Sequence, residues 1–231
     1  MAKPTADGPL PLALIGLTVV TGLVDAVSYL GLGHVFVANM TGNVVFLGFL
    51  AGGAADFSAA LSLAAIGSFA LGALASGRLG WNTGGHRGRL LAVSSGIQAA
   101  VVAGALLVSL ASFGVRDGIS AHALVLLLAF AMGLQTATVR RLGVPDLTTT
   151  VLTLTVTGLA ADSLLAGGAH PNTGRRLAAI AAMFVGAFVG AVLVFRVSVS
   201  AALAVALVLL VWNAMAGYRW STSTAAWTAA K

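Results

Sequence analysis

One acidic residue stands inside a long apolar stretch near the start of the chain. Asp25 is the only charged residue between Leu10 and Leu32, and at 1.5 Å per helical residue it lies about 10 Å from the C-terminal end of that stretch. A carboxylate near the centre of a bilayer costs about 2.5–3.5 kcal/mol on insertion scales, so we expect it to face the protein interior and to have a partner. The functional interpretation is a protonatable or cation-coordinating site. The alternative is a structural hydrogen-bond hub that holds Thr or Asn side chains of the next segment.

A polar block, Asn39-Met40-Thr41-Gly42-Asn43, interrupts the second apolar stretch. Carboxamides and hydroxyls can orient a polar solute or coordinate an ion through oxygen, and Gly42 lets the backbone turn or approach closely. The same residue types also cap helix ends, so a helix break stabilised by its own side chains is the competing interpretation.

The second half of the chain carries neutral polar groups in a comparable place. Gln135-Thr136 aligns with Val24-Asp25, and a Thr-rich run spans Leu147–Thr157. Thr hydroxyls inside membranes commonly bond the carbonyl four residues back or join helices, which accounts for most of this run. Thr153, which aligns with Thr41, is the member of the run that we select as a binding residue.

These residues define a candidate site for a solute or an ion, without a catalytic group. The set is Asp25, Asn39, Thr41, Asn43, Gln135, Thr136 and Thr153. The chain shows no nucleophile–base–acid constellation and no phosphate-binding Gly-x-x-x-x-Gly-Lys pattern. It has no Cys, and its four His show no metal-ligand spacing. We therefore expect no enzyme activity, no cofactor and no metal.

The composition of the chain points to a membrane protein. Its 231 residues are 59% hydrophobic and only 8% charged, whereas a soluble domain has about 25% charged residues. The net charge of +6 comes from twelve scattered Lys and Arg against six Asp. We read these basic residues as setting membrane orientation and expect no nucleic-acid partner. The excess of Arg over Lys, with abundant Ala and Gly, suggests a GC-rich bacterial source.

Eight apolar stretches fill almost the whole chain, and no soluble domain fits between them. Each is near the length of about 20 residues that a membrane-spanning helix needs. They are Leu10–Leu32, Val35–Gly53, Ser58–Leu79, Leu90–Ser112, Ile119–Val139, Leu147–Gly168, Leu177–Phe195 and Val197–Tyr218. The sequence thus predicts an all-α polytopic membrane protein with a single transmembrane domain over residues 1–231.

The distribution of basic residues favours six crossings over eight. Eight crossings would divide the twelve Lys and Arg equally between the two sides, against the positive-inside rule. If the second and sixth stretches re-enter on the side from which they came, ten basic residues and both termini share one side. Only Arg116 and Arg196 then face the other. We expect six transmembrane helices and two re-entrant or broken segments, with eight crossings as the alternative.

The two halves of the chain resemble each other in sequence. Gly22-Leu23-Val24-Asp25-Ala26 aligns with Gly133-Leu134-Gln135-Thr136-Ala137, and Gly72-Ala73 is aligned with Gly190-Ala191. The predicted repeats run from about 9 to 113 and from about 119 to 218. Three crossings in each half would make the repeats inverted, the architecture of many secondary transporters. Eight crossings would make them parallel.

The most specific blocks also resemble a known family. Gly22–Leu30, Phe36–Asn43 and Gly133–Ala137, together with the Thr-rich run, are similar to the YoaK family of bacterial membrane proteins, a domain of unknown function. The resemblance covers nearly the full length. It implies a multi-pass bacterial membrane protein of about six helices, and it implies no substrate, reaction or cofactor.

From these observations we expect a small secondary transporter or permease for a small polar solute or ion, with proton coupling through Asp25 as an option. The alternative is a membrane scaffold or assembly partner that transports nothing. The expected partners are the lipid bilayer and the solute or proton, with a homodimer as a further option. The expected location is the bacterial inner membrane, with both termini in the cytoplasm.

Overall fold

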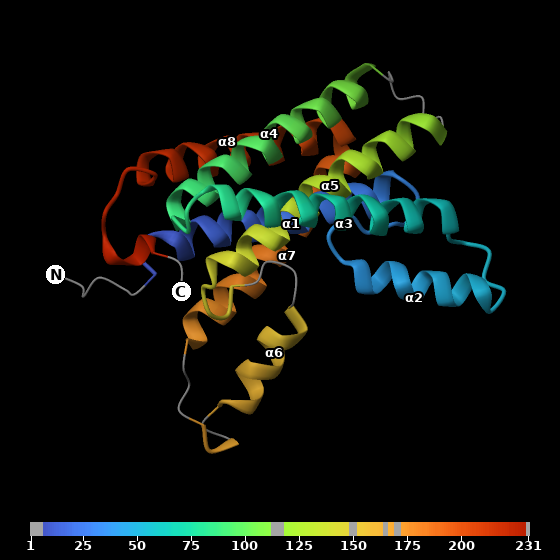
Figure 1. Cartoon of the computed structure of the whole chain (residues 1–231). Coiled ribbons are helices and arrows are strands. Elements are labelled where there is room, and N and C mark those ends of the chain that lie inside the picture. The colour runs from blue at the N-terminus through green and yellow to red at the C-terminus, as the bar shows by residue number, and fades with distance from the viewer. Residues whose placement is uncertain (1–6, 112–117, 148–151, 164–165, 169–171, 230–231) are drawn as a thin grey trace.

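The computed structural model describes residues 7–111, 118–147, 152–163, 166–168 and 172–229. These ranges are almost entirely helical (Figure 1). The α-helices are α1 (Leu10–Gly31), α2 (Met40–Ala51), α3 (Ala59–Asn82), α4 (Arg87–Ala111), α5 (Gly118–Leu142), α6 (Leu152–Ala161), α7 (Thr173–Arg196) and α8 (Val199–Trp220). A short 3-10 helix, η2 (Ala226–Thr228), follows α8.

Helix length separates these elements into two kinds and confirms the predicted all-α membrane fold. In the described part of the chain, six helices of 22 to 25 residues are long and apolar enough to cross a membrane. The apolar helices α2 and α6 have only 12 and 10 residues. At 1.5 Å per residue they reach about 18 and 15 Å, short of a hydrocarbon core of about 30 Å.

Helix α1 lies at the centre of the bundle. Its most apolar window is 72% buried, whereas the corresponding windows of the other long helices are 22–50% buried. The buried Thr18 and Thr21 each donate a hydrogen bond to the carbonyl four residues earlier, which satisfies their hydroxyls within the helix. A helix that is apolar nearly all round is suited to this central place.

Two close helix crossings join the halves of the chain, α1 against α7 and α3 against α5. A Cβ atom added to Gly22 of α1 would lie 2.3 Å from the Met183 carbonyl oxygen of α7. A Cβ atom added to Gly72 of α3 would lie 2.0 Å from the Phe130 carbonyl oxygen of α5. Only glycine lets these backbones approach so closely, as at other small-residue contacts in membranes.

The second apolar stretch folds back on itself before α2 begins. Residues 32–39 are not helical, and they return along α1 to the level of Asp25. Helix α2 then runs outward to the end of the bundle where α3 begins (Figure 1). Non-helical backbone at this depth requires shelter by protein, which the neighbouring helices provide. Figure 1 also shows α2 and α6 projecting from the same side of the bundle.

The N and C labels lie at the opposite end of the bundle (Figure 1), where Arg87 and Arg175 both contact Asp7. The buried Arg87 donates hydrogen bonds to the carbonyl of Leu142, to the carbonyl of Trp227 and to Asp7. Arg175 pairs with the other carboxylate oxygen of Asp7 at 3.1 Å. One guanidinium thus ties the segments before α1 and after α8 to the ends of α4 and α5.

Candidate functional site

Asp25 is buried in α1 and binds the segment that returns along this helix. Its Oδ1 accepts hydrogen bonds from the backbone N–H groups of Val37 at 3.1 Å and Ala38 at 2.9 Å. Its Oδ2 accepts one from Asn39 Nδ2 at 2.7 Å. Because the three donors come from the last residues before α2, the carboxylate fixes where this short helix begins. Two predicted site residues, Asp25 and Asn39, are therefore in direct contact.

Asn43 holds the same segment from the other side. Its Oδ1 accepts the Phe36 N–H at 2.9 Å, and its Nδ2 donates to the Phe36 carbonyl at 2.6 Å. Both backbone groups of Phe36 are thus paired with one carboxamide. Gly42 leaves room for the Phe36 ring, since a Cβ atom there would lie 2.6 Å from that ring. Thr41, in the first turn of α2, is exposed.

A partly open cavity of about 320 Å³ lies beside Asp25. It is bounded by α1, by α7 and by the segment that precedes α2. The lining residues with polar or aromatic groups are Asp25, Tyr29, Phe36 and Asn39. The others are small or apolar, namely Gly22, Ala26, Leu30, Met183, Ala187 and Ala191. Gly22 therefore serves both the crossing with α7 and the wall of this cavity.

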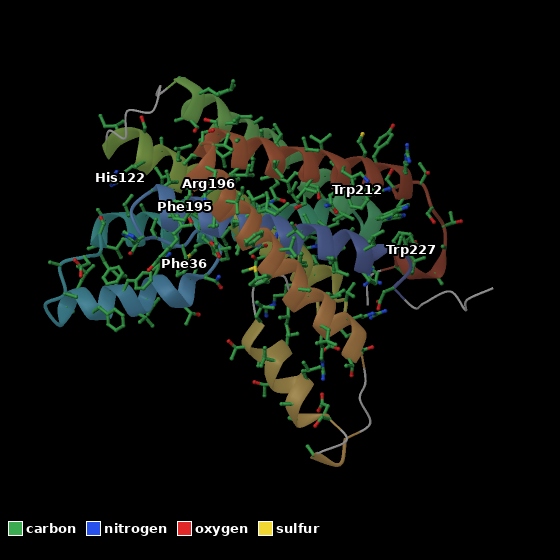
Figure 2. All side chains as sticks on the ribbon, turned by 180° about the vertical axis from the view of Figure 1, so that it is seen from behind. Phe36, His122, Phe195, Arg196, Trp212 and Trp227 are labelled. Atoms are coloured by element: carbon green, nitrogen blue, oxygen red, sulfur yellow. The ribbon has the colours of Figure 1, made fainter. Side chains whose placement is uncertain are left out.

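Aromatic rings form a continuous cluster around the beginning of α2. Tyr29 stacks on Phe36 with 4.9 Å between ring centroids, and Phe36 stacks on Phe46 at 5.8 Å. Phe46 in turn stacks on Phe57 at 4.5 Å. Figure 2 labels Phe36 beside α2. Sequence reasoning missed Tyr29 and Phe36 as lining residues because aromatic side chains are common throughout membrane helices.

The predicted residue Gln135 belongs to a separate buried network in the bundle. It accepts a hydrogen bond from Gln98 Nε2 at 2.7 Å, and it donates to Thr21 Oγ1 at 2.8 Å and to the Leu17 carbonyl at 3.2 Å. These bonds join α1, α4 and α5. A second hydroxyl contact, from Thr138 to both Ser76 and Ser94, joins α3, α4 and α5. In sequence, these interhelical hydrogen-bonding residues cannot be distinguished from the residues of a binding site.

Thr136, the aligned partner of Asp25, has no described hydrogen bond. Its hydroxyl oxygen is buried and is without a partner among the residues that the structure describes. The predicted residue Thr153 is exposed on α6, and so is Thr157. Thr148, Thr149 and Thr150 lie outside the described residues. The two halves therefore do not contribute matching polar groups to the cavity beside Asp25.

The short helix α6 is held by a cation. Arg176 in α7 donates a hydrogen bond to the Gly158 carbonyl at 2.5 Å and pairs with Asp162 at 2.7 Å and Asp146 at 2.9 Å. Gly158 leaves room for the guanidinium, because a Cβ atom there would lie 2.8 Å from Arg176 Cζ. A cation at the C-terminal end of a helix is favoured by the helix dipole.

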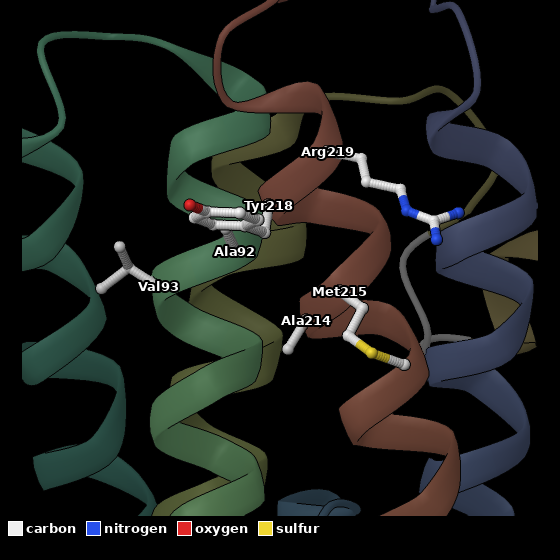
Figure 3. Close-up of a pocket in the computed structure, with 6 residues that line it drawn as sticks. All are labelled: Ala92, Val93, Ala214, Met215, Tyr218 and Arg219. Atoms are coloured by element: carbon white, nitrogen blue, oxygen red, sulfur yellow. The ribbon is translucent and has the colours of Figure 1, made fainter.

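A second hollow of about 520 Å³ lies on the outside of α4 and α8 (Figure 3). Its walls are Ala92, Val93, Ala214, Met215, Tyr218 and Arg219. Figure 3 shows the Tyr218 ring near Ala92, while Arg219 extends from the other side of α8. This hollow has no buried polar group that could orient a solute, so the cavity beside Asp25 is the better candidate site.

The helices and the polar contacts between them define a polytopic α-helical membrane protein. The chain belongs to the family described as "Protein of unknown function (DUF1275)", whose model matches residues 13–216. It is also similar to the UPF0700 transmembrane protein YoaK of Bacillus subtilis (strain 168), with 34% identity over 152 residues. That match covers 65% of this chain and 65% of the relative. The resemblance to the YoaK family is thereby confirmed. No solved structure matches the chain.

Proposed function

We propose that this protein is a small secondary transporter or permease whose solute site is the cavity beside Asp25. The observation that carries the proposal is a buried carboxylate that lines a partly open cavity next to a broken membrane segment. Solute sites of transporters are commonly built where helices are discontinuous near the middle of the bilayer. Intramembrane carboxylates commonly mark ion or proton pathways, so Asp25 is also the group through which protons would be coupled.

We further propose that the two halves are inverted repeats. A Cβ atom on Gly22 would meet the carbonyl of Met183, which lies three residues before Gly186. A Cβ atom on Gly133 would likewise meet the carbonyl of Phe69, which lies three residues before Gly72. Gly22 and Gly133 therefore hold equivalent places in the two crossings. Gly72 and Gly186 are equivalent too, because they would meet the carbonyls three residues before Gly133 and Gly22, respectively. This correspondence favours Gly186 over Gly190 as the counterpart of Gly72. In the described residues, each half has three helices long enough to cross the membrane and one short apolar helix, and an odd number of crossings in each half is what inversion requires.

The arginine-rich end of the bundle supports a cytoplasmic location for both termini in a bacterial cell membrane. Eight of the nine arginines in the described residues lie at this end, and Arg196 lies at the other.

The orientation can be tested by cysteine labelling, because the chain has no Cys and a single introduced cysteine is a unique reporter. A cysteine at Ala55, between α2 and α3, should react with a membrane-impermeant maleimide only from outside the cell. A cysteine at Gly84 should react only from inside, and the reverse pattern would contradict this orientation.

A scaffold without transport is the second candidate function, and one observation favours it. Asp25 already accepts three hydrogen bonds, which is what a structural hub would do. Neither candidate includes enzyme chemistry.

A homodimer would use a face other than Gly186 and Gly190, because both glycines pack against α1 of the same chain.

Transport is tested on the purified protein in two steps. A thermal-shift screen of small polar metabolites and alkali-metal ions selects compounds that raise the unfolding temperature. Uptake of each selected compound is then measured in proteoliposomes and in protein-free liposomes. We expect protein-dependent uptake that Asp25→Asn abolishes and that Asp56→Asn, in the exposed loop after α2, leaves unchanged. Binding without uptake would favour the scaffold, and full uptake by Asp25→Asn would remove Asp25 from the mechanism.

A further inference from the structure

The walls of the cavity beside Asp25 combine one negative charge with apolar and aromatic surface. Among the described residues that line it, the Asp25 carboxylate is the only charged group, and the other polar side chains are Asn39 and Tyr29. Pockets that bind small molecules commonly measure about 300–1,000 Å³, so a cavity of about 320 Å³ suits a ligand of few atoms. The lining therefore restricts both the charge and the size of what can bind.

The charge of Asp25 has no cationic partner among the described residues. Its three bound donors are two backbone N–H groups and a carboxamide, all of them neutral. The ion pairs of the described chain involve Asp7, Asp146 and Asp162 instead. A carboxylate has about four acceptor positions, so three bonds leave part of Oδ2 unoccupied, and a cation in the cavity can approach it. A buried charge is most stable when paired, which favours a cationic ligand.

The rest of the cavity wall selects among cations. A metal ion such as Mg²⁺ needs several oxygen ligands, and the side chains that line this cavity offer oxygens only from Asp25, Asn39 and Tyr29. Alkyl groups, in contrast, fit the apolar wall that Ala187, Ala191 and Met183 provide. Aromatic side chains beside a negative group are the surroundings that proteins use to bind alkylated ammonium ions.

We propose that this cavity binds a small organic monocation, an ammonium ion that carries alkyl groups, with its charge against Asp25 and its alkyl groups against Tyr29 and Phe36. The proposal rests on the proposed function in that the same cavity is taken as the solute site. An anion would be repelled by Asp25. A sugar would leave most of its hydroxyl groups without a partner on the apolar wall.

Binding is tested by isothermal titration calorimetry of the full chain in detergent, with chemically matched probes. The cationic probes are tetramethylammonium and choline. The neutral probe is 3,3-dimethyl-1-butanol, which has the shape of choline without its charge, and the remaining probes are Na⁺ and acetate. We expect choline and tetramethylammonium to bind and the neutral probe to bind at least about tenfold more weakly. Equal binding of choline and the neutral probe would overturn the proposal, and so would binding of Na⁺ or acetate alone.

Paired variants distinguish the effect of the negative charge on choline binding from an effect on folding. Asp25→Asn should weaken choline binding about tenfold or more. The double variant Asp25→Asn with Asn39→Asp should restore part of it, because it returns one negative charge to the cavity and preserves the side-chain hydrogen bond. Tyr29→Leu should weaken binding about fivefold. Phe49→Leu changes a ring of the same aromatic cluster that does not line the cavity, and it should have no effect. Choline binding that none of the cavity variants alters would overturn the proposal.

The two proposals fail in different ways. Choline that binds at Asp25 but does not cross proteoliposomes supports the cation site and contradicts transport. Asp25-dependent uptake of a neutral or anionic solute, without competition from choline, supports transport and overturns the cation site.

Discussion

The two halves of the molecule use the same close helix crossings but hold their short helices with opposite charges. In the first half, the Asp25 carboxylate binds the segment at the N-terminal end of α2. In the second half, the Arg176 guanidinium binds the C-terminal end of α6. Both arrangements agree with the helix dipole, whose positive end is the N-terminus. Similar helix crossings are therefore compatible with different polar groups, and the buried anion beside the cavity belongs to the first half.

The largest effect should come from the glycines at the crossings, where the halves are most alike. Gly72→Ala and Gly186→Ala would each place a Cβ atom about 2 Å from a backbone carbonyl oxygen. The helices must then separate, and we expect each variant to lose about 2–3 kcal/mol or more. The measurement is thermal unfolding in detergent.

Gly67→Ala is the matched control, because nothing lies within 4 Å of a Cβ atom at that position of α3. It should be neutral or gain up to about 1 kcal/mol from helix propensity. If Ala is tolerated at Gly186 but not at Gly72, the crossings of the two halves are not equivalent.

The next effect should come from Asp25, where the halves differ. Asp25→Ala leaves the Val37 and Ala38 N–H groups and the Asn39 carboxamide without their acceptor. A buried N–H group without a partner costs about 1–3 kcal/mol, but Asn39 is partly exposed and water in the open cavity can replace part of the lost bonds, so we expect a total of about 2 kcal/mol. We expect a lower unfolding temperature and faster hydrogen exchange in residues 36–44, with exchange in α6 unchanged. Uniform acceleration over both short helices would show that Asp25 does not act locally.

Arg176→Ala should give a smaller loss of stability, because its carboxylate partners Asp146 and Asp162 are 19% and 43% exposed and water can replace part of the lost pairing. Its effect should be confined to the second half, as faster hydrogen exchange in residues 152–163. Arg176→Lys should restore part of the protection, since Lys keeps the charge but lacks the planar set of donors. Protection of α6 that survives Arg176→Ala would mean that packing on α7 alone holds this helix.

The smallest effect should come from Thr136, the position in α5 that aligns with Asp25. Its hydroxyl has no partner among the described residues, so Thr136→Val removes a buried polar group that stabilises nothing. We expect an unchanged or slightly higher unfolding temperature. A clear loss of stability would instead assign Thr136 a hydrogen-bonding role comparable to that of Asp25.

Local features of the fold could be predicted from the sequence. The apolar stretches predicted the helices, but their lengths alone indicated eight spans of similar size, whereas α2 and α6 have only 12 and 10 residues. The block Asn39–Asn43 predicted a break in the second stretch, and the structure places the non-helical residues at 32–39, directly before α2. The charge distribution favoured six crossings and two re-entrant or broken segments, which agrees with the six helices in the described residues that are long enough to cross a membrane. These properties depend on residues that are close in sequence, which is why they could be read without a structure.

The pairing of distant residues could not be predicted. Gln135 and Asp25 are polar residues at similar depths of aligned helices, yet Gln135 faces α4 and α1 whereas Asp25 faces the segment before α2. Which face of an apolar helix meets which neighbour is decided by glycine contacts between the halves. Tyr29 and Phe36 could not be identified as lining residues from the sequence, because the cavity is completed by residues of α7, which is distant in the chain.

The glycine crossings also bear on the order in which the chain is made. Helix α1 is synthesised before α7, although α7, which packs closely against it, belongs to the other half of the chain. Until α7 is synthesised, Gly22 and the carboxylate three residues later are covered only by lipid, by the segment before α2 or by the insertion machinery. Because α3 likewise waits for α5, assembly must follow insertion as a separate stage. A ribosome-bound chain that stops before α7 should therefore be inserted but not yet packed.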